Sequence, residues 1–234
     1  MTDFSSLGLN PQLCRACDAL GYVSPSPIQE KAIPLMLQGH DVLGIAQTGT
    51  GKTAAYALPV LMRCKYAQGK NPRTLILAPT RELVMQIHEV MVGLAVETDL
   101  RILALYGGLG PKTQIQALEA GIDILVSTPG RFLELYRKDA IVVKELKILI
   151  LDEADKMMDM GFMPQIREIL EKIPYKKRQN GLFSATFPEK VENLSHEFLE
   201  FPQKVEITRQ ATPASQVTQF VYEAANLSTK INAL

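Results

Sequence analysis

Short apolar runs alternate along this chain with longer amphipathic segments, and this alternation constrains the fold more than any other feature. The apolar runs lie at residues 41–46, 73–78, 101–106, 123–127, 146–151, 181–184 and 204–207. Segments with helical character separate most of them, among them residues 52–66, 81–96, 112–120 and 164–172. Alternating strands and helices form βαβ units and a parallel sheet, and strands without polar interruption are typical of a sheet buried on both faces. The sequence therefore predicts an α/β fold, a mostly parallel sheet covered by helices on both faces.

Small and polar residues follow these runs at the ends where the strands should stop. Examples are Gly49 after the first run, Thr80 after the second and Asp152 after the fifth. In open parallel sheets, ligands bind beyond the carboxyl ends of the strands. We therefore expect the polar groups of several strands to converge on one rim.

Charge and hydropathy limit the partners of the chain. It has 25 basic and 25 acidic residues among 234, so no overall positive field gathers nucleic acid, and nucleic-acid binding would depend on local backbone donors and a few arginines. No apolar run approaches the ~20 residues that a membrane span needs. We expect a soluble, cytoplasmic protein without membrane contact.

The cysteine and histidine patterns offer only a weak alternative. Cys14 and Cys17 form a CxxC pair, which could be half of a zinc site or a redox pair. The pair lies in a helical segment, residues 11–20, and no second CxxC follows, so ordinary packing is the favoured interpretation. The three histidines are scattered and show no metal-ligand spacing.

A glycine-rich segment between a strand and a helix predicts a phosphate-binding loop. Its glycines would let backbone N–H groups surround a β-phosphate at the N-terminus of a helix. The lysine would reach the β- and γ-phosphates, and the last threonine would offer a hydroxyl to Mg²⁺. The generic pattern has glycine where this chain has alanine. The segment consists of Ala46, Gln47, Thr48, Gly49, Thr50, Gly51, Lys52 and Thr53.

Two acidic residues follow the apolar strand 147–151 directly. A carboxylate in this position beside a phosphate loop is expected to anchor Mg²⁺. We assign this role to Asp152, partly through water, and expect Glu153 to orient or deprotonate the attacking water. Together with Lys52, these are the predicted catalytic residues.

The segment Asp152, Glu153, Ala154 and Asp155 spells D-E-A-D, and from Phe4 to Ile207 the chain resembles the first RecA-like P-loop domain of DEAD-box ATP-dependent RNA helicases. The resemblance is nearest to the bacterial RhlE-type enzymes. That family also has alanine at the first position of the phosphate loop. Further matching segments are residues 21–29, 46–53, 79–83, 107–108, 128–131 and 184–186.

The resemblance implies that the segment ending at Gln29 recognises adenine. A glutamine amide both donates and accepts, as adenine N6 and N7 require, whereas the same edge of guanine offers two acceptors. Tyr22 would stack on the purine, and Phe4 would support Tyr22. Ser26 replaces the usual threonine and keeps the hydroxyl. ATP or ADP with Mg²⁺ is the expected ligand.

The resemblance also implies an RNA-binding surface and a coupling motif. Such loops hold phosphates through backbone N–H groups, hydroxyls and arginines, so binding of single-stranded or duplex RNA should be independent of sequence. The implied RNA contacts are Pro79, Thr80, Arg81, Gly107, Gly108, Thr128, Pro129, Gly130 and Arg131. The implied coupling residues, with a hydrogen bond expected to Asp155, are Asp155, Ser184, Ala185 and Thr186.

The predicted organisation has three parts. Residues 1–30 form the adenine-recognition segment, residues 31–208 the ATP-binding domain, and residues 209–234 a linker with the start of a second RecA-like domain. A strand is expected at 217–224 and a helix from 229. In the family, the second domain supplies an arginine finger worth ~10³–10⁵ in rate in related systems. We therefore expect this piece alone to bind nucleotide and RNA with almost no turnover.

Three other functions remain open. A DNA helicase or translocase could share the core, although Gln29 and Asp155 argue against it. A non-catalytic ATP-gated RNA clamp would not need Glu153. A nucleotide kinase would explain the phosphate loop but not the other segments on the rim.

Overall fold

The computed structural model describes residues 3–174 and 178–207, and the predicted linker, strand 217–224 and helix from 229 lie outside them. Seven strands form one sheet: β1 (Val42–Ile45), β2 (Thr74–Leu77), β3 (Ile102–Leu105), β4 (Ile124–Ser127), β5 (Ile148–Leu151), β6 (Gln179–Ser184) and β7 (Gln203–Glu206). The order across the sheet is β3-β4-β2-β5-β6-β1-β7, and every pairing is parallel. The predicted α/β class and parallel sheet are confirmed.

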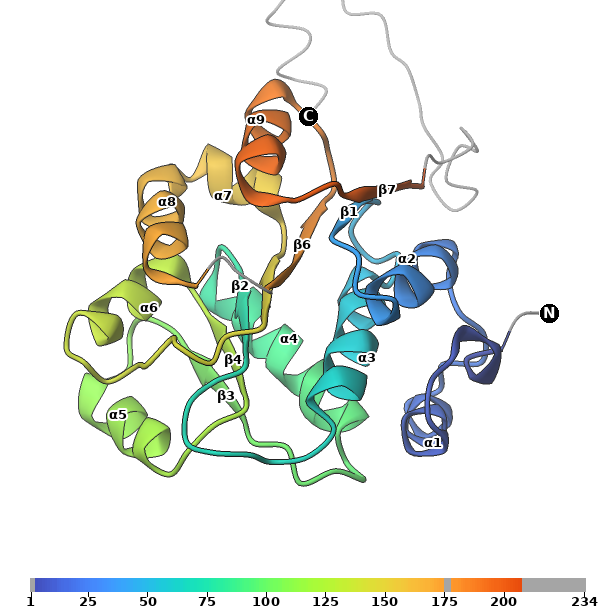
Figure 1. The fold of residues 1–234 in the computed structure, drawn as a ribbon, viewed down its shortest axis with the longest axis horizontal. Helices are drawn as coiled ribbons and strands as arrows, with labels where there is room; N and C mark the ends of the chain where they lie inside the picture. Colours follow the sequence, from blue (N-terminus) through green and yellow to red (C-terminus); the bar gives the residue numbers. More distant parts are fainter. Residues whose placement is uncertain (1–2, 175–177, 208–234) are drawn as a thin grey trace, which may run out of the picture.

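Helices cover both faces of this sheet (Figure 1). The helical elements are η1 (Ser5–Leu7), α1 (Pro11–Ala19), α2 (Pro27–Leu37), α3 (Lys52–Cys64), α4 (Arg81–Leu94), α5 (Pro111–Glu119), α6 (Pro129–Tyr136), α7 (Ala154–Asp159), α8 (Met163–Lys172) and α9 (Glu189–Phe198). The helices expected at 52–66, 81–96, 112–120 and 164–172 are present, with ends that differ by one or two residues, and the helical segment expected at 11–20 corresponds to α1. Of the remaining helices, α2 and α6 begin at prolines, and α7 has only six residues.

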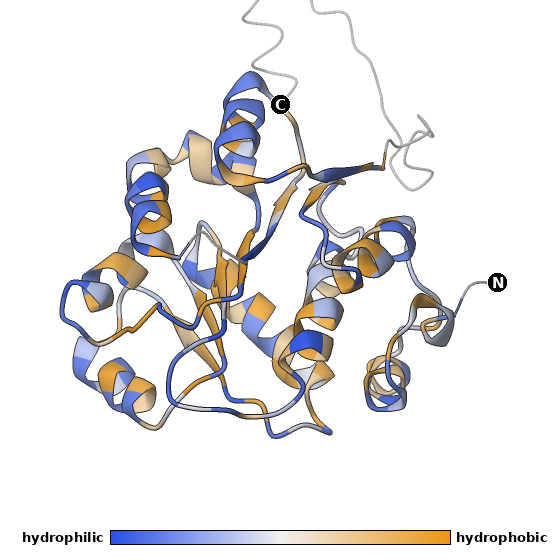
Figure 2. Cartoon of the chain, in the orientation of Figure 1, coloured by the Kyte–Doolittle hydropathy of each residue, from blue (hydrophilic) through white to orange (hydrophobic). Residues whose placement is uncertain are grey.

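Alternation along the buried strands divides the interior into two hydrophobic clusters. In β5, Ile148 and Ile150 join the cluster under α1 to α4, whereas Leu149 and Leu151 join the cluster under α5 to α9. Successive side chains of a strand point to opposite faces, so a strand that is apolar throughout is covered on both sides. Figure 2 shows the central strands mostly in orange and the outer helices with many blue residues.

Local signals explain where several helices begin. Asn10 caps α1, since its side chain accepts a hydrogen bond of 2.9 Å from the backbone N–H of Leu13, and Pro11 takes the first helical position. Thr80 caps α4 in the same way through the N–H of Leu83, at 3.2 Å. Cys14 and Cys17 lie on α1 as free thiols, and Cys17 is fully buried.

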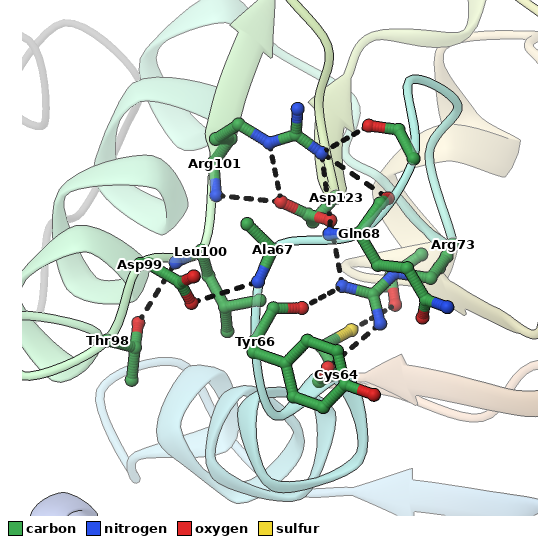
Figure 3. Close-up of polar contacts among 12 residues, drawn as sticks. Cys64, Tyr66, Ala67, Gln68, Arg73, Thr98, Asp99, Leu100, Arg101 and Asp123 are labelled. Atoms are coloured by element: carbon green, nitrogen blue, oxygen red, sulfur yellow. Dashed lines mark hydrogen bonds and ion pairs between the residues drawn. The ribbon is translucent and has the colours of Figure 1, made fainter.

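A buried ionic cluster ties together the amino-terminal ends of three strands, at the sheet edge opposite the predicted rim (Figure 3). Arg73, Arg101 and Asp123 each precede the first residue of β2, β3 and β4. Asp123 is fully buried and accepts from Arg73 Nη2 at 2.8 Å and Arg101 Nε at 2.9 Å. Burial would raise the pKa of Asp123, but these hydrogen bonds lower it to about 2.

No helix in the described ranges, 3–174 and 178–207, combines the length and the apolar character that crossing a bilayer requires.

Candidate functional site

The glycine-rich loop joins β1 to α3 in a conformation that only glycine adopts easily. Gly49 and Gly51 have φ angles of 82° and 89°, and Gly51 caps α3. A Cβ atom on Gly51 would lie 2.4 Å from Nε2 of Gln29. The loop therefore needs glycine at 51 for both its backbone angle and the space beside it.

A pocket of about 460 Å³ opens beside this loop. It brings together residues of the phosphate loop, the adenine segment and the acidic pair after β5, which lie far apart in the sequence. The lining residues are Tyr22, Gln29, Thr48, Gly49, Gly51, Lys52, Thr53, Ala54, Leu83, Gln86, Val90, Asp152 and Glu153. Three segments that were predicted separately thus form one site.

Lys52 is the cation of this pocket. Its side chain is buried, and Nζ donates a hydrogen bond to the carbonyl oxygen of Ala46. Burial lowers the pKa of Lys52, while the charges of Asp152, Glu153 and Asp155 oppose that effect. The lysine therefore lies between the loop and the acidic groups, where a bound phosphate would add negative charge.

Asp152 is 2% exposed, directly after β5. Its Oδ2 accepts a hydrogen bond of 2.8 Å from the Tyr56 hydroxyl, and its Oδ1 accepts one of 2.9 Å from the backbone N–H of Glu153. Burial raises the pKa of Asp152 to about 6, although the Tyr56 hydrogen bond and Lys52 act in the opposite direction. Because burial disfavours the ionised form of Asp152, a cation bound beside it would stabilise that form.

These residues fit Mg²⁺ that arrives with a nucleotide. Mg²⁺ is usually held by one or two protein oxygens together with phosphates and water, and Asp152 and Thr53 on the pocket wall provide such oxygens. Within the described part of the chain, no group of three or more His, Cys, Asp or Glu side chains could hold a metal by itself. A site that depends on the ligand's own phosphates agrees with both observations.

Glu153 has a strained backbone. Its φ and ψ of 53° and 51° place it in the left-handed region, which costs a non-glycine residue about 1–2 kcal/mol. Its side chain is buried and forms an ion pair of 2.8 Å with Lys156, one turn later in α7. This left-handed conformation bends the chain away from the direction of β5 and places Glu153 at the wall of the pocket.

The coupling motif contacts the acidic segment as expected. Asp155 Oδ2 accepts hydrogen bonds from the backbone N–H of Thr186 at 2.9 Å and from its hydroxyl at 2.8 Å. The Ser184 hydroxyl accepts from the N–H of Asp155 at 3.2 Å. Burial raises the pKa of Asp155, but the Thr186 and other hydrogen bonds lower it below the ordinary value. The predicted hydrogen bond between the two motifs is confirmed.

The adenine segment lies against the phosphate loop. Gln29 is 6% exposed, donates from Nε2 to the Gly51 carbonyl at 3.0 Å and accepts at Oε1 from the Ser26 N–H at 2.9 Å. An amide has two N–H donors and two lone pairs on its oxygen, so one donor and one lone pair remain for a base. Phe4 is buried with its ring centroid 6.3 Å from that of Tyr22.

The segments expected to contact RNA follow β2, β3 and β4, which are neighbours in the sheet. Arg81 is exposed, and its guanidinium lies 4.9 Å from the centroid of the Tyr106 ring. Gly108 has a φ of 92°, and a Cβ there would lie 3.4 Å from Arg81 Nη1. Arg81 therefore lies beside the two-glycine loop with its charge open to solvent.

Arg131 has a different environment. It is 8% exposed, its Nη2 donates to the Leu109 carbonyl at 2.8 Å, and its Nη1 lies 3.4 Å from Oε2 of Glu134. Gln114, also buried, donates from Nε2 to the Tyr106 carbonyl at 3.2 Å. These two side chains hold the backbone on both sides of Gly107 and Gly108. In this conformation Arg131 supports the loop, and a direct RNA contact of Arg131 stays a prediction.

Three residues of the site were missed from sequence: Tyr56, Gln114 and Lys156. The sequence around Tyr56 is typical of a buried helix. No local pattern predicts that its hydroxyl contacts Asp152, 96 positions later. From the sequence, Gln114 and Lys156 are expected to be ordinary surface residues of helices. Lys156 offered a signal, because it stands three residues after Glu153 at the spacing of a helical ion pair.

The strand order separates the two groups of segments. β5, β6 and β1 carry the acidic pair, the coupling motif and the phosphate loop, while β3, β4 and β2 carry the other three segments. A parallel sheet with a phosphate loop before α3 and an acidic residue after β5 defines a RecA-like P-loop nucleotide-binding domain.

Comparisons with known proteins identify the family. The family model described as DEAD/DEAH box helicase matches residues 26–194. The chain is 43% identical over 217 residues to the ATP-dependent RNA helicase DeaD of Buchnera aphidicola, covering 92% of this chain and 36% of that protein. It is 40% identical over 220 residues to the ATP-dependent RNA helicase CshA of Listeria monocytogenes, covering 94% and 42%. The chain belongs to the DEAD/DEAH box helicase family.

A solved structure agrees with this assignment. A DEAD box protein from the hyperthermophile Methanococcus jannaschii superposes with a TM-score of 0.83 at 34% identity, over 88% of this chain and 56% of that chain. The chain spans 36% and 42% of the length of the two curated relatives named above. The narrower resemblance to RhlE-type enzymes stays a prediction.

Proposed function

We propose that this chain is the ATP-binding part of an ATP-dependent RNA helicase, in which it binds Mg-ATP and the RNA backbone. The observation that carries the proposal is the single pocket that joins Gln29, Lys52 and Asp152. An amide for the base, a cation for the phosphates and a carboxylate for the metal are the groups that Mg-ATP requires.

Each residue has a role that follows from its position. Lys52 would neutralise the β- and γ-phosphates, and the loop glycines would present backbone N–H groups. Thr53 and Asp152 would hold Mg²⁺, which neutralises charge that develops on the phosphates. Glu153 would accept a proton from the attacking water after its ion pair with Lys156 opens.

Turnover and unwinding would need a partner domain. No arginine lines the pocket formed by the described residues, so the charge of the transition state lacks the arginine that accelerates related reactions by ~10³–10⁵. We infer that a second RecA-like domain supplies this group and completes the RNA path. The boundaries at residues 30 and 208 are part of this proposal, and residues 209–234 would lead into the second domain.

RNA binding would be independent of base sequence and would use β3, β4 and β2. Arg81, beside Gly108, is an exposed positive charge on this part of the rim. Phosphate contacts of this kind position a strand without reading its bases. A DNA helicase remains the second candidate, and parallel titrations with RNA and DNA strands of one sequence would separate the two.

The experiment compares Glu153→Gln and Lys52→Ala in the full-length protein. Glu153→Gln should bind ATP as the wild type does and lose RNA-stimulated hydrolysis, because the amide keeps the shape but not the basicity. Lys52→Ala should lose both. Glu168→Gln is the matched control, because Glu168 pairs with Arg137 on the surface. Wild-type hydrolysis by Glu153→Gln would refute the assignment of Glu153.

A further inference from the structure

We infer that Tyr56 is a positioning residue for Mg²⁺ binding, whose hydroxyl fixes the orientation of the Asp152 carboxylate. The inference rests on the proposed function of the pocket and adds a residue that neither the glycine-rich loop nor the acidic motif contains. Tyr56 acts through Asp152 and has no predicted contact with the nucleotide itself.

The first argument is the geometry of the hydroxyl. Tyr56 lies on α3, one turn after Thr53, so both side chains lie on the same face of the helix. Its hydroxyl donates to Asp152 Oδ2 at 2.8 Å. Tyr56 therefore holds the carboxylate assigned to the metal, and it lies one helical turn from Thr53, the other residue assigned to it.

The second argument is that the Tyr56 ring has no freedom to move. The side chain is fully buried. Its ring packs against Phe183 of β6, with centroids 5.1 Å apart and planes inclined by 52°. Phe183 in turn fills the space above Gly44, where a Cβ atom would lie 2.5 Å from the ring. A hydroxyl on a rigid ring fixes its acceptor more firmly than a mobile side chain or water does.

The third argument concerns the hydrogen bonds that orient the Asp152 carboxylate. Asp152 has one donor on each oxygen, Tyr56 on Oδ2 and the Glu153 N–H on Oδ1. Together they define the plane of the carboxylate and leave its remaining lone pairs for the metal or its water. Groups that hydrogen-bond a metal-binding carboxylate typically change metal affinity about 10–100-fold when they are removed.

Phenylalanine at 56 would fill the same volume without the hydroxyl. A buried phenol without a partner is unfavourable, because it loses its hydrogen bonds to water. The hydroxyl at this position is therefore accounted for by its acceptor, the carboxylate of Asp152.

The test is a Mg²⁺ titration of nucleotide binding with the Tyr56→Phe variant of the full chain. The probe is a slowly hydrolysed fluorescent ATP analogue, and the readout is the Mg²⁺ concentration at half-maximal binding. We expect this midpoint to rise on the order of 10-fold, with little change in binding measured in EDTA. Tyr136→Phe is the control, since Tyr136 stacks on Phe132 of α6 with centroids 6.2 Å apart and does not line the pocket.

A double-mutant cycle tests whether Tyr56 acts through Asp152. In the Asp152→Asn background, Tyr56→Phe should change the Mg²⁺ midpoint by less than about two-fold. An unchanged midpoint for Tyr56→Phe alone, or equal effects in both backgrounds, would overturn the inference. If the wild type bound no nucleotide, or bound it independently of Mg²⁺, the proposed function would fail first, so the two failures are distinguishable.

Discussion

Replacing Asp123 by asparagine should destabilise the domain through the buried cluster at the amino-terminal ends of β2, β3 and β4. Asp123 accepts hydrogen bonds from the side chains of Arg73 and Arg101 and from the backbone N–H groups of Gln68 and Arg101. An asparagine keeps the shape, but its NH₂ group would face the donors now bound to one carboxylate oxygen. Arg73 would lose the carboxylate that balances its buried charge.

Two estimates of the stability lost in the Asp123→Asn variant agree in direction. The pKa of Asp123 is about 2 against an ordinary value of 3.8, and this depression corresponds to about 2 kcal/mol of stability. Removing one partner of a buried ion pair typically costs about 3–5 kcal/mol, because the remaining charge is left uncompensated. We expect a loss of about 3 kcal/mol or more in the free energy of unfolding at pH 7.

The assay is urea denaturation of wild type and variant at pH 7 and pH 3. Because the folded-state pKa of Asp123 is depressed, its contribution is complete above pH 3.8 and disappears as pH falls through 2. At pH 3 about half of this contribution remains. The difference between wild type and variant should therefore shrink by about 1 kcal/mol between the two pH values.

Asp99→Asn is the matched control, because Asp99 is exposed and accepts a single hydrogen bond from the backbone N–H of Ala67 in the same region. The Asp99→Asn variant should lose less than about 1 kcal/mol in the free energy of unfolding. If Asp123→Asn were no more destabilising than this control, or if its effect were the same at pH 3 and pH 7, the account of the cluster would be wrong.

Two further predictions concern the pocket. Gln29→Ala should weaken ATP binding on the order of 10-fold with a smaller effect on GTP, measured by titration of both nucleotides; equal losses would limit Gln29 to supporting Gly51. Asp152→Asn should raise the free energy of unfolding at pH 7 by about 1–3 kcal/mol. The pKa of Asp152 is raised from 3.8 to about 6, so its charge destabilises the fold above pH 6 and this penalty disappears below 3.8. A less stable variant in thermal or urea unfolding would contradict this reasoning.

The sheet and the phosphate loop were predictable because their causes are local. An apolar run such as Ile148–Leu151 needs cover on both faces, and a glycine pair before Lys52 restricts the loop whatever surrounds it. The rim followed from the rule that parallel strands end on the same edge. The ends of elements were less exact, and β6 begins at Gln179, two residues before the predicted strand, because polar residues there bond to Met36, His40 and Asp41 instead of facing solvent.

Contacts between distant side chains were not predictable from local patterns; the hydrogen bond of Asp155 to Thr186, 31 positions later, was expected only from the family resemblance. Arg131 is an arginine in a loop motif, and the sequence does not show that it turns inward to the Leu109 carbonyl. Tyr56 and Asp152 meet because β1, β5 and β6 lie in the sheet order β5-β6-β1, which sequence patterns do not determine. The motifs of the site can thus be found from local sequence, whereas the contacts between them depend on the tertiary structure.

The first turn of α7 connects Glu153 to the predicted coupling motif through Lys156 and Asp155. Lys156 forms an ion pair with Glu153 through its side chain, and its backbone N–H donates to Asp155 Oδ1 at 3.0 Å. The same Asp155 binds Thr186 through its other carboxylate oxygen. If Glu153 turns towards a water at the γ-phosphate, it must release Lys156. That release changes the charge beside Asp155, whose ionised form holds Thr186. We therefore predict that a change at the nucleotide reaches Thr186 through Glu153, Lys156 and Asp155.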